Sequence, residues 1–230
     1  MRPAYRRRLP DRRCRVRAGW HHGTMTTPAE KARFREDWRG RRRDLPLPVR
    51  AAQSAALTEA LLQWYLPRAE HRRVASVMSY GTEPDTARLH ARLHREGVEV
   101  LVPVTEPERQ MSWVRWFPDV SMGRSSVAPI QEPLGDRLTA RTMQTVDLVV
   151  VPALVVDAHG YRMGQGGGYY DRFLDGLRAE RERTGRGPLT MAAVFEHELV
   201  RPGVLPVESF DQPVDAVVTA RGVSWTDPEA

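Results

Sequence analysis

The sequence predicts an α/β fold: a three-layer α/β/α single domain with a mostly parallel, Rossmann-like central sheet. Three observations predict it. Apolar runs typical of buried strands alternate with segments of helical periodicity, as in 74–80, 85–96 and 98–102. A glycine-rich segment joins the apolar run 146–152 to a helical pattern that begins near Tyr169. A chain of 230 residues is long enough for one such domain, and no interior linker indicates a second.

The positive charge of the chain lies in its first residues. The formal net charge is +6, and residues 1–24 hold eight arginines and one acid, so they contribute +7 and leave −1 for the remainder. The folded part is not basic, and we expect no nucleic-acid partner. We expect residues 1–24 to be a disordered extension that is not natively translated, with Met25 as the native start. The alternative is an arginine-rich targeting or binding arm.

Nothing in the composition indicates a membrane or a secreted protein. No apolar run approaches the roughly 20 residues that span a bilayer, so we expect no membrane contact. The single cysteine, Cys14, allows no internal disulfide and suits a reducing compartment. We expect a cytoplasmic monomer or weak homodimer, with the α/β domain over residues 25–223 and a disordered tail over 224–230.

The first predicted helix runs from Pro28 to about residue 43. Thr27 and Glu30 have the spacing of a capping box, and the proline suits the first helical position. Lys31 and Arg35 are four residues apart and share one face of this helix. Taken alone, such a pair is usually a solvated basic face. We expect the arginines at positions 42 and 43 to face solvent.

Lysine is used once in the chain. Lys31 is the only lysine among 35 basic residues. A compact ammonium and a planar guanidinium are not interchangeable, so the exception hints at a site that needs a point charge.

A second helix is predicted over 49–66, with a core stripe of leucines and a tyrosine. Next come a strand over 74–80, a helix that is capped by Asp85 and runs to residue 96, and a strand over 98–102. This strand–helix–strand order predicts a right-handed parallel crossover. Ligands bind off the carboxyl ends of such strands, where Glu83 lies. Without further evidence Glu83 is a surface carboxylate.

Four more strands complete the predicted sheet, over 112–117, 147–151, 191–195 and 214–219. A polar loop is predicted over 123–136. Trp113 and Trp116 are more typical of half-buried strand aromatics than of a platform for a flat ligand. The Glu-His-Glu sequence at 196–198 is too poor in spaced histidines for a metal site and is expected to form a strand-end loop.

The segment 160–171 is expected to bind phosphate. Five of its twelve residues are glycine, and it lies between a strand and a helix start. Glycines leave backbone N–H groups accessible, and the helix N-terminus adds donors and a positive dipole end. Arg162 can clamp a phosphate with two hydrogen bonds, and Asp171 can hold Mg²⁺ through oxygen. The alternative is a glycine turn that only joins strand to helix.

The sequence Gly-Tyr-Arg-Met-Gly-Gln-Gly-Gly-Gly-Tyr-Tyr-Asp at 160–171 closely resembles the signature of the 5-formyltetrahydrofolate cyclo-ligase (methenyltetrahydrofolate synthetase) family. The segment Pro-Ala-Leu-Val-Val-Asp at 152–157 resembles the family's lead-in, and the resemblance covers roughly residues 29–222. It implies an ATP- and Mg²⁺-dependent ligase that converts 5-formyltetrahydrofolate to 5,10-methenyltetrahydrofolate. In this reaction the formyl oxygen is phosphorylated and N10 then displaces phosphate.

The resemblance also implies roles for individual residues. Lys31 and Arg162 are the expected catalytic residues. The expected ATP-binding residues are Lys31, Arg35, Arg162, Gly164, Gly166, Gly167, Gly168, Tyr169 and Tyr170. The expected folate-binding residues are Met78, Glu83, Gln165, Gly166, Gly167, Gly168 and Tyr169. The expected Mg²⁺ ligands are Asp171 and Asp211.

Two other functions remain open. Pro84 stands where the family usually has an aliphatic residue, and no aromatic precedes Ile130 in the polar loop. Both features are compatible with a repurposed, non-catalytic nucleotide- or folate-binding protein of the same fold. The third hypothesis is a nucleic-acid-binding protein that acts through the arginine-rich residues 1–24.

Overall fold

A computed structural model describes residues 27–208 and 211–227. Its main sheet has seven strands in the order β12-β11-β9-β6-β1-β2-β3. The five inner strands pair in parallel, and the two edge strands, β3 and β12, pair antiparallel to their neighbours. These strands are β1 (Arg73–Ser76), β2 (Glu99–Glu106), β3 (Gln110–Trp116), β6 (Leu148–Pro152), β9 (Leu189–Ala193), β11 (Ala216–Thr219) and β12 (Gly222–Trp225). The predicted α/β fold with a mostly parallel sheet is confirmed.

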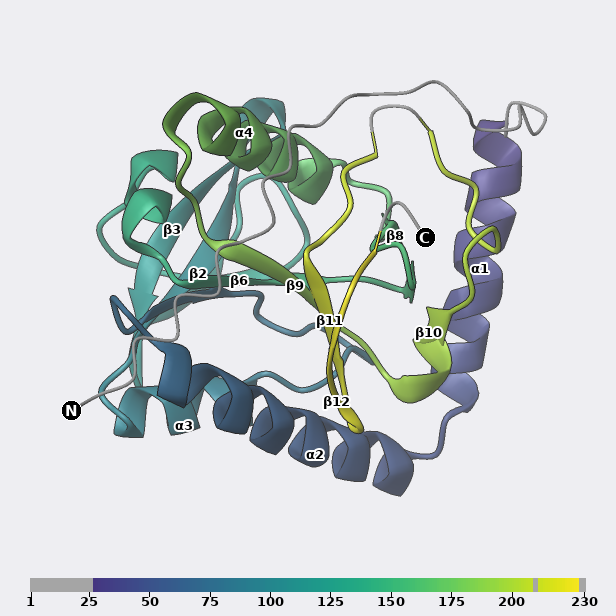
Figure 1. Ribbon diagram of the computed structural model, residues 1–230, viewed down its shortest axis with the longest axis horizontal. Helices are drawn as coiled ribbons and strands as arrows, with labels where there is room; N and C mark the ends of the chain where they lie inside the picture. The colour runs from purple at the N-terminus through teal and green to yellow at the C-terminus, as the bar shows by residue number, and fades with distance from the viewer. Residues whose placement is uncertain (1–26, 209–210, 228–230) are drawn as a thin grey trace.

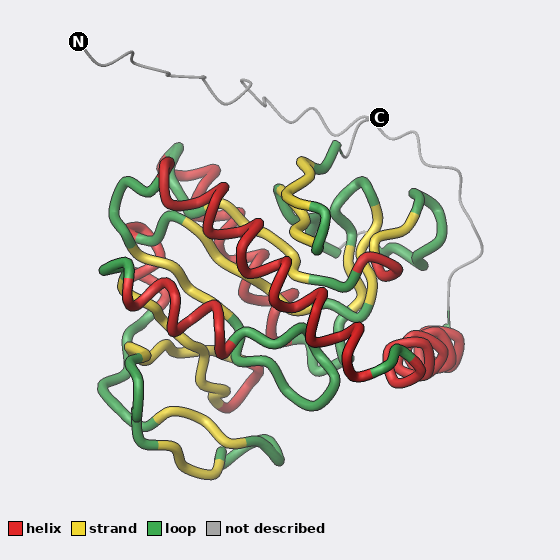
Figure 2. The backbone as a smooth tube through the Cα atoms, turned by 90° about the horizontal axis from the view of Figure 1, so that it is seen from below, coloured by secondary structure: helices red, strands yellow, loops and turns green. Residues whose placement is uncertain are grey.

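Helices cover both faces of this sheet. The α-helices are α1 (Pro28–Asp44), α2 (Leu47–Tyr65), α3 (Ala87–Arg95) and α4 (Tyr169–Thr184). Figure 1 shows α2 and α3 on one face and α4 on the other, with α1 at the side of the sheet. Viewed from below in Figure 2, the helices (red) cross the strands (yellow) and α1 is seen nearly end-on. Each face has its own apolar cluster of buried side chains.

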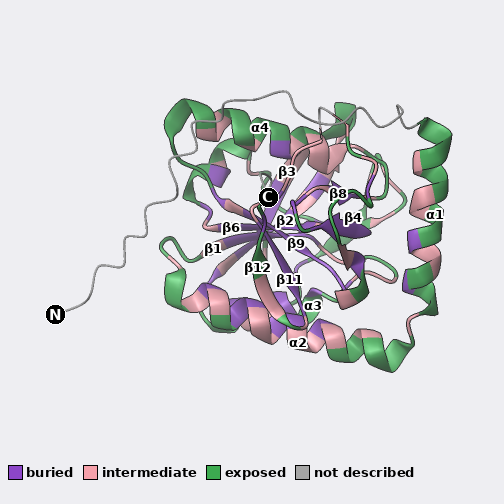
Figure 3. Ribbon diagram, turned by 45° about the vertical axis from the view of Figure 1, so that its right-hand side comes forward, coloured by how far each residue is buried: buried purple, intermediate pink, exposed green. Residues whose placement is uncertain are grey.

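Short elements complete the chain. The small sheet β10-β7-β8 consists of β7 (Val155–Asp157), β8 (Arg162–Met163) and β10 (Leu199–Val200). The short 3-10 helices are η1 (Leu66–Arg68), η2 (Pro107–Arg109), η3 (Ala140–Thr145) and η4 (Glu196–Glu198). Figure 3 shows the inner strands of the main sheet as mostly buried, whereas the outward faces of α1, α2 and α4 are exposed.

The first two helices agree with the prediction. Thr27 accepts from the N–H of Glu30, whose carboxylate accepts in return from the Thr27 N–H at 2.6 Å, so the capping box is present. In α2, the predicted core stripe is fully buried, because these side chains recur on the face that packs against the sheet. The stripe consists of Leu57, Leu61, Leu62 and Tyr65.

The first strand is shorter than predicted. β1 ends at Ser76 instead of residue 80, because the chain leaves the sheet to pair with the start of α3. There the Thr86 hydroxyl donates to the Val77 carbonyl oxygen at 2.9 Å. Thr86, and not Asp85, is the N-cap of α3, although the Asp85 carboxylate accepts from the N–H of Ala87 at 2.9 Å. The crossover brings residues 77–86 to the carboxyl end of β1.

Two predictions of irregular structure are wrong. The predicted polar loop 123–136 contains a small antiparallel pair, β4 (Met122–Arg124) and β5 (Gln131–Pro133). The predicted disordered tail from residue 224 begins inside β12, which pairs with β11 in the register Thr219↔Gly222. The edge strand is held there because Trp225 packs edge-on against Trp64 of α2, with the ring centroids 6.0 Å apart. Residues 228–230 lie outside the described residues, as do residues 1–26.

The two tryptophans of β3 are structural, as expected. Trp113 is fully buried on the α4 side, with its ring centroid 5.2 Å from that of Phe173. Trp116 packs on the other side against His90 of α3 at 5.4 Å. Neither ring is presented to a ligand.

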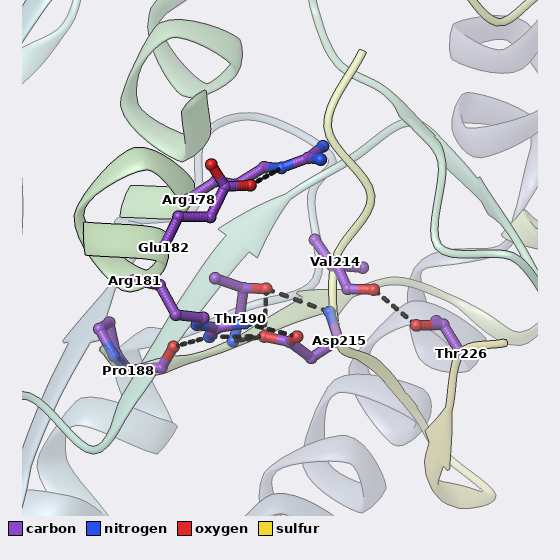
Figure 4. A network of polar contacts seen from close by, with 8 residues as sticks. All are labelled: Arg178, Arg181, Glu182, Pro188, Thr190, Val214, Asp215 and Thr226. Atoms are coloured by element: carbon purple, nitrogen blue, oxygen red, sulfur yellow. Dashed lines mark hydrogen bonds and ion pairs between the residues drawn. The ribbon is translucent and has the colours of Figure 1, made fainter. Parts of the chain in front are cut away.

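Helix α4 is tied to the sheet by a polar network at its C-terminal half (Figure 4). Arg181 donates to both carboxylate oxygens of Asp215, at 2.9 and 3.1 Å, and also to the carbonyl of Pro188. Thr190 donates to the same carboxylate through its N–H and its hydroxyl, at 2.8 Å each. The network therefore holds the C-terminal half of α4, which continues to Thr184, against β9 and the start of β11.

The prediction that Arg42 faces solvent is wrong. Its side chain is 1% exposed and lies on the same face of α1 as Trp38, four residues earlier. The Arg42 guanidinium donates to both carboxylate oxygens of Glu198, at 2.6 and 2.8 Å, and to the carbonyl oxygen of Ala153 at 2.6 Å. This fully buried pair fixes α1 against the ends of β6 and β9.

Candidate functional site

The glycine-rich segment leads from the β7–β8 hairpin into α4. Asp157 closes the hairpin by accepting from the N–H groups of His159 and Tyr161, at 3.0 Å each. The following segment then takes two left-handed turns, at Gly166 (φ 102°) and at Gly168 (φ 75°), the N-cap of α4. Side chains are strained in this region of backbone space, so both positions favour glycine.

The backbone amides of this segment are available to a ligand. Across the described residues, the N–H groups of residues 165–170 donate to no protein acceptor. The first paired amide of α4 is that of Arg172, which donates to the Gly168 carbonyl oxygen at 3.2 Å. Unpaired donors at a helix N-terminus, together with the positive end of the helix dipole, form an anion-binding arrangement. These amides are therefore arranged as in an anion-binding site, and phosphate binding by this segment stays a prediction.

Helix α1 lies along the same segment with its basic face inward. Arg35 Nε donates to the Gly164 carbonyl oxygen at 3.2 Å. Arg39, one turn further along α1, donates to the side chain and the carbonyl oxygen of Gln165 at 2.9 and 3.1 Å. Arg39 was not among the predicted site residues, although its four-residue spacing from Arg35 puts it on this face.

Lys31 lies on the same face of α1 but contacts carboxylates. Its Nζ is 2.5 Å from Glu208 Oε2 and 3.9 Å from Asp211 Oδ2, and its side chain is 12% exposed. The two helix cations thus border the segment from different sides, with Arg35 over the glycines and Lys31 beside the predicted metal ligand Asp211.

The predicted phosphate clamp and the first predicted metal ligand contact each other. The Arg162 side chain is 2% exposed, and its Nη2 donates to Asp171 Oδ1 at 2.9 Å. Its buried Nε has no hydrogen-bond partner among the described residues. A buried charged donor without an acceptor is unfavourable unless a ligand supplies one.

The two predicted metal ligands are close enough to interact. Burial raises the pKa of the Asp211 carboxyl. The N–H of Glu208 and the charge of Lys31 lower this pKa, whereas the carboxylate of Asp171 raises it. A hard cation favours oxygen donors and would relieve this repulsion, so the pair fits a divalent ion such as Mg²⁺. No cluster of three or more potential protein ligands occurs in the described residues, so substrate oxygens or water would complete the coordination.

Two predicted folate-binding residues, Glu83 and Gln165, lie near the predicted ATP-binding residues Arg162 and Tyr170. Glu83 accepts from the N–H of Tyr80 at 3.0 Å, and burial raises the pKa of its carboxyl, whereas the amide of Gln165 acts to lower it. The Tyr170 hydroxyl is buried without a hydrogen-bond partner among the described residues. Burial, and next the charge of Glu83, raise the pKa of Tyr170, whereas the charge of Arg162 lowers it. The side chains of Glu83, Gln165, Tyr170 and Arg162 therefore lie in one polar region.

The remaining predicted residues border this region from both sides. Met78 follows β1 and packs, half-buried, against the apolar cluster below the sheet. Tyr169 lies over the glycine segment, so that a methyl group on Gly167 would be 3.2 Å from its ring. A hollow of about 510 Å³ between α2 and the β11–β12 turn contains none of the predicted residues.

No helix among the described residues is long and apolar enough to cross a membrane.

Comparison with known proteins gives concordant results. Residues 27–220 match the model of the 5-formyltetrahydrofolate cyclo-ligase family. A 5-formyltetrahydrofolate cyclo-ligase of Mycolicibacterium smegmatis is 28% identical over 201 residues, which are 85% of this chain and 96% of that protein. The enzyme of the same name from Escherichia coli K12 is 28% identical over 183 residues, 79% of this chain and 95% of that one.

The fold agrees with a solved structure of the same enzyme type. The 5,10-methenyltetrahydrofolate synthetase of Aquifex aeolicus superposes with a TM-score of 0.66 at 26% sequence identity. The superposition covers 87% of this chain and 93% of that one.

Proposed function

The chain belongs to the 5-formyltetrahydrofolate cyclo-ligase family, and from this premise we propose how its residues close 5-formyltetrahydrofolate to 5,10-methenyltetrahydrofolate at the expense of ATP. One observation carries the proposal. The unpaired amides of residues 165–170 precede α4 and are flanked by the cations of α1, which is an arrangement suited to a triphosphate.

The reaction needs a better leaving group than a formamide oxygen. The formyl oxygen attacks the γ-phosphorus of ATP, and the bond from that phosphorus to the oxygen of ADP breaks. N10 of the folate then attacks the activated formyl carbon and loses its proton, and the C–O bond breaks to release phosphate. Phosphoryl transfer of this kind requires positioning and charge neutralisation more than a covalent nucleophile.

Each residue of the site has its own role in these two steps. The amides of residues 165–170 and Arg35 bind the phosphates, and Lys31 neutralises charge on the transferring group. The Arg162 guanidinium donates to Asp171, and we infer that bound phosphate replaces Asp171 as its acceptor and also accepts from Nε, which has no partner among the described residues. Asp171 and Asp211 would then hold Mg²⁺, which supplies charge neutralisation at the phosphates.

The folate-binding residues lie on the other side of the glycine segment. Glu83 and Gln165 have the hydrogen-bonding groups to bind a pterin ring, and Tyr169 and the glycines at 166–168 would border the formyl group. Met78 would contribute an apolar wall. We also propose that the protein works in the cytoplasm as a monomer or weak homodimer.

A direct assay tests the proposal. Purified protein mixed with 5-formyltetrahydrofolate and MgATP is expected to produce the near-ultraviolet absorbance of 5,10-methenyltetrahydrofolate, and to produce none without ATP. Absence of the signal at generous enzyme concentration would favour a repurposed, non-catalytic binding protein. The assay repeated on the chain without residues 1–24 is expected to give the same rate, because these residues lie outside the matched range 27–220.

Glu83→Gln is expected to weaken the binding of 5-formyltetrahydrofolate and to increase the thermal stability of the protein at pH 7. The pKa of Glu83 in the folded chain is raised above its usual 4.5. At pH values between 4.5 and this raised pKa, the folded chain binds a proton that the unfolded chain has lost, so the stability of the fold decreases as pH rises. Glutamine removes this dependence, so the Tm of the variant should exceed that of the wild type at pH 7 and match it near pH 4. The KM for 5-formyltetrahydrofolate should rise about tenfold, because a hydrogen bond to a charged group is lost.

Thermal unfolding at both pH values and steady-state kinetics measure these effects. Glu208→Gln, a carboxylate of the ATP side, is the matched control and should leave the KM for the folate unchanged. A wild-type KM in Glu83→Gln would remove this residue from the folate site.

A further inference from the structure

The tip of the β2–β3 hairpin has an unusual backbone. The N–H of Gln110 donates to the Pro107 carbonyl oxygen and closes a turn whose two central residues are both left-handed, Glu108 at φ 56° and Arg109 at φ 57°. A turn with two positive φ angles is the one that Asn-Gly favours, because side chains are strained there. Such strain at non-glycine residues collects at functional sites and points to a role for one of the two side chains.

The turn places Arg109 on the glycine segment. A methyl group on Gly168, the N-cap of α4, would lie 3.4 Å from Arg109 Cδ and 3.5 Å from its Nη1. The adjacent Gln110 holds the hairpin there: with its amide oxygen turned toward α4, it accepts from Nε and Nη2 of Arg172 at 2.7 Å each. The packing of Trp113 against Phe173 joins the same two elements deeper in the core.

Three guanidinium groups thus lie against alternate glycines of one segment. Measured from a methyl group at each glycine, Arg162 Nη1 is 3.7 Å from Gly164 and Arg35 Nε is 3.3 Å from Gly166. Arg109 repeats the arrangement at the third position, where the helix dipole also contributes positive charge.

Two of these three positive charges have no carboxylate partner among the residues that the structure describes. Arg162 pairs with Asp171 and Arg35 donates to a carbonyl oxygen. Arg109, by contrast, makes no hydrogen bond or ion pair with any residue that the structure describes. Like charges gathered at a helix N-terminus repel one another unless an anion lies between them. The buried, unpaired Nε of Arg162 independently indicates that such an anion binds here.

We propose that Arg109 is a further substrate-binding residue, whose guanidinium binds a phosphate group of the bound nucleoside triphosphate from the hairpin side. The strained turn holds the side chain against Gly168 at the N-terminus of α4, two residues from the glycine that Arg35 of α1 lies against. The inference rests on the proposed function of residues 165–170 as a triphosphate cradle. It adds the tip of the β2–β3 hairpin to the phosphate-binding part of the site, besides α1 and the glycine segment itself.

Arg109→Gly tests the proposal because glycine keeps the left-handed backbone without strain. The dissociation constant of MgATP, measured by calorimetry on the full chain, is expected to rise about tenfold, or about 1.4 kcal/mol, while Tm stays equal or increases. Arg109→Lys, which keeps the charge, should recover part of the affinity. The KM for 5-formyltetrahydrofolate should change less than twofold in both variants.

The matched control is Arg115→Ala, in the same strand pair but at its other end, where Arg115 is exposed and pairs with Glu99. This variant should bind MgATP as the wild type does. Wild-type affinity in Arg109→Gly, combined with weakened binding in Arg35→Ala, would overturn the role of Arg109 and leave the cradle intact. Failure of the wild-type chain to bind MgATP would instead overturn the cradle, and the role of Arg109 with it.

Discussion

Lys31→Ala is expected to lower the turnover of 5-formyltetrahydrofolate and ATP at least ~10-fold, the scale of one lost charge contact in a transition state. Lys31 faces the site from α1, 3.9 Å from the proposed metal ligand Asp211 and one turn before Arg35. Its ammonium is a compact charge that can follow a phosphoryl group between donor and acceptor oxygens. The effect should fall on the chemical step more than on the KM for ATP, because Arg35 and the amides remain.

Single-turnover kinetics on the purified variant measure this step directly. Arg33→Ala removes an exposed cation from the same helix and serves as the matched control, with an expected rate equal to wild type. Lys31→Arg should recover only part of the rate, because the larger planar group replaces a point charge. An unchanged single-turnover rate in Lys31→Ala would reject the assigned role.

Arg42→Ala is expected to have the largest effect on stability, about 3–5 kcal/mol, the usual cost of removing one partner of a buried ion pair. Glu198 is fully buried and would keep the N–H of Phe195 as its hydrogen-bond donor, with His197 Nε2 3.9 Å from Oε1, but would lose its guanidinium partner. The Arg42 donor to Ala153 would also be lost. Because this pair fixes α1 beside the glycine segment, the variant should also bind MgATP less tightly.

Urea unfolding at pH 7, compared at equal m-values, measures the loss. The control is Arg43→Ala, one residue along, whose guanidinium pairs with the exposed Glu36 and whose removal should have almost no effect. The double variant Arg42→Met with Glu198→Leu removes both charges and should recover most of the stability, since an apolar pair of similar volume replaces the ions. A loss below about 1 kcal/mol in Arg42→Ala would show that the pair is not needed to hold α1.

The sequence predicted the local features well because their signals are local. The capping box at Thr27 and the start of α4 at Tyr169 each depend on residues within one or two turns of one another. The glycine positions followed from the same logic, since Gly166 and Gly168 have the positive φ angles that glycine favours. The cation pair on α1 was predicted from its four-residue spacing.

The sequence could not predict contacts that depend on how distant segments pack. Arg42 and Glu198 are separated by 156 positions, and no local pattern distinguishes a buried arginine from the exposed one beside it. The approach of Arg109 to Gly168 likewise requires the register of the β2–β3 hairpin and its docking on α4. The edge strand β12 was missed because its four residues carry little apolar pattern and depend on pairing with β11.

A structure of the chain with Mg²⁺ and a non-hydrolysable ATP analogue tests the central claim most directly. The account predicts triphosphate oxygens within about 2.7–3.2 Å of backbone nitrogens in residues 165–170, with Arg162 turned from Asp171 toward a phosphate. A triphosphate bound elsewhere, or those amides turned away from it toward protein acceptors, would contradict the account.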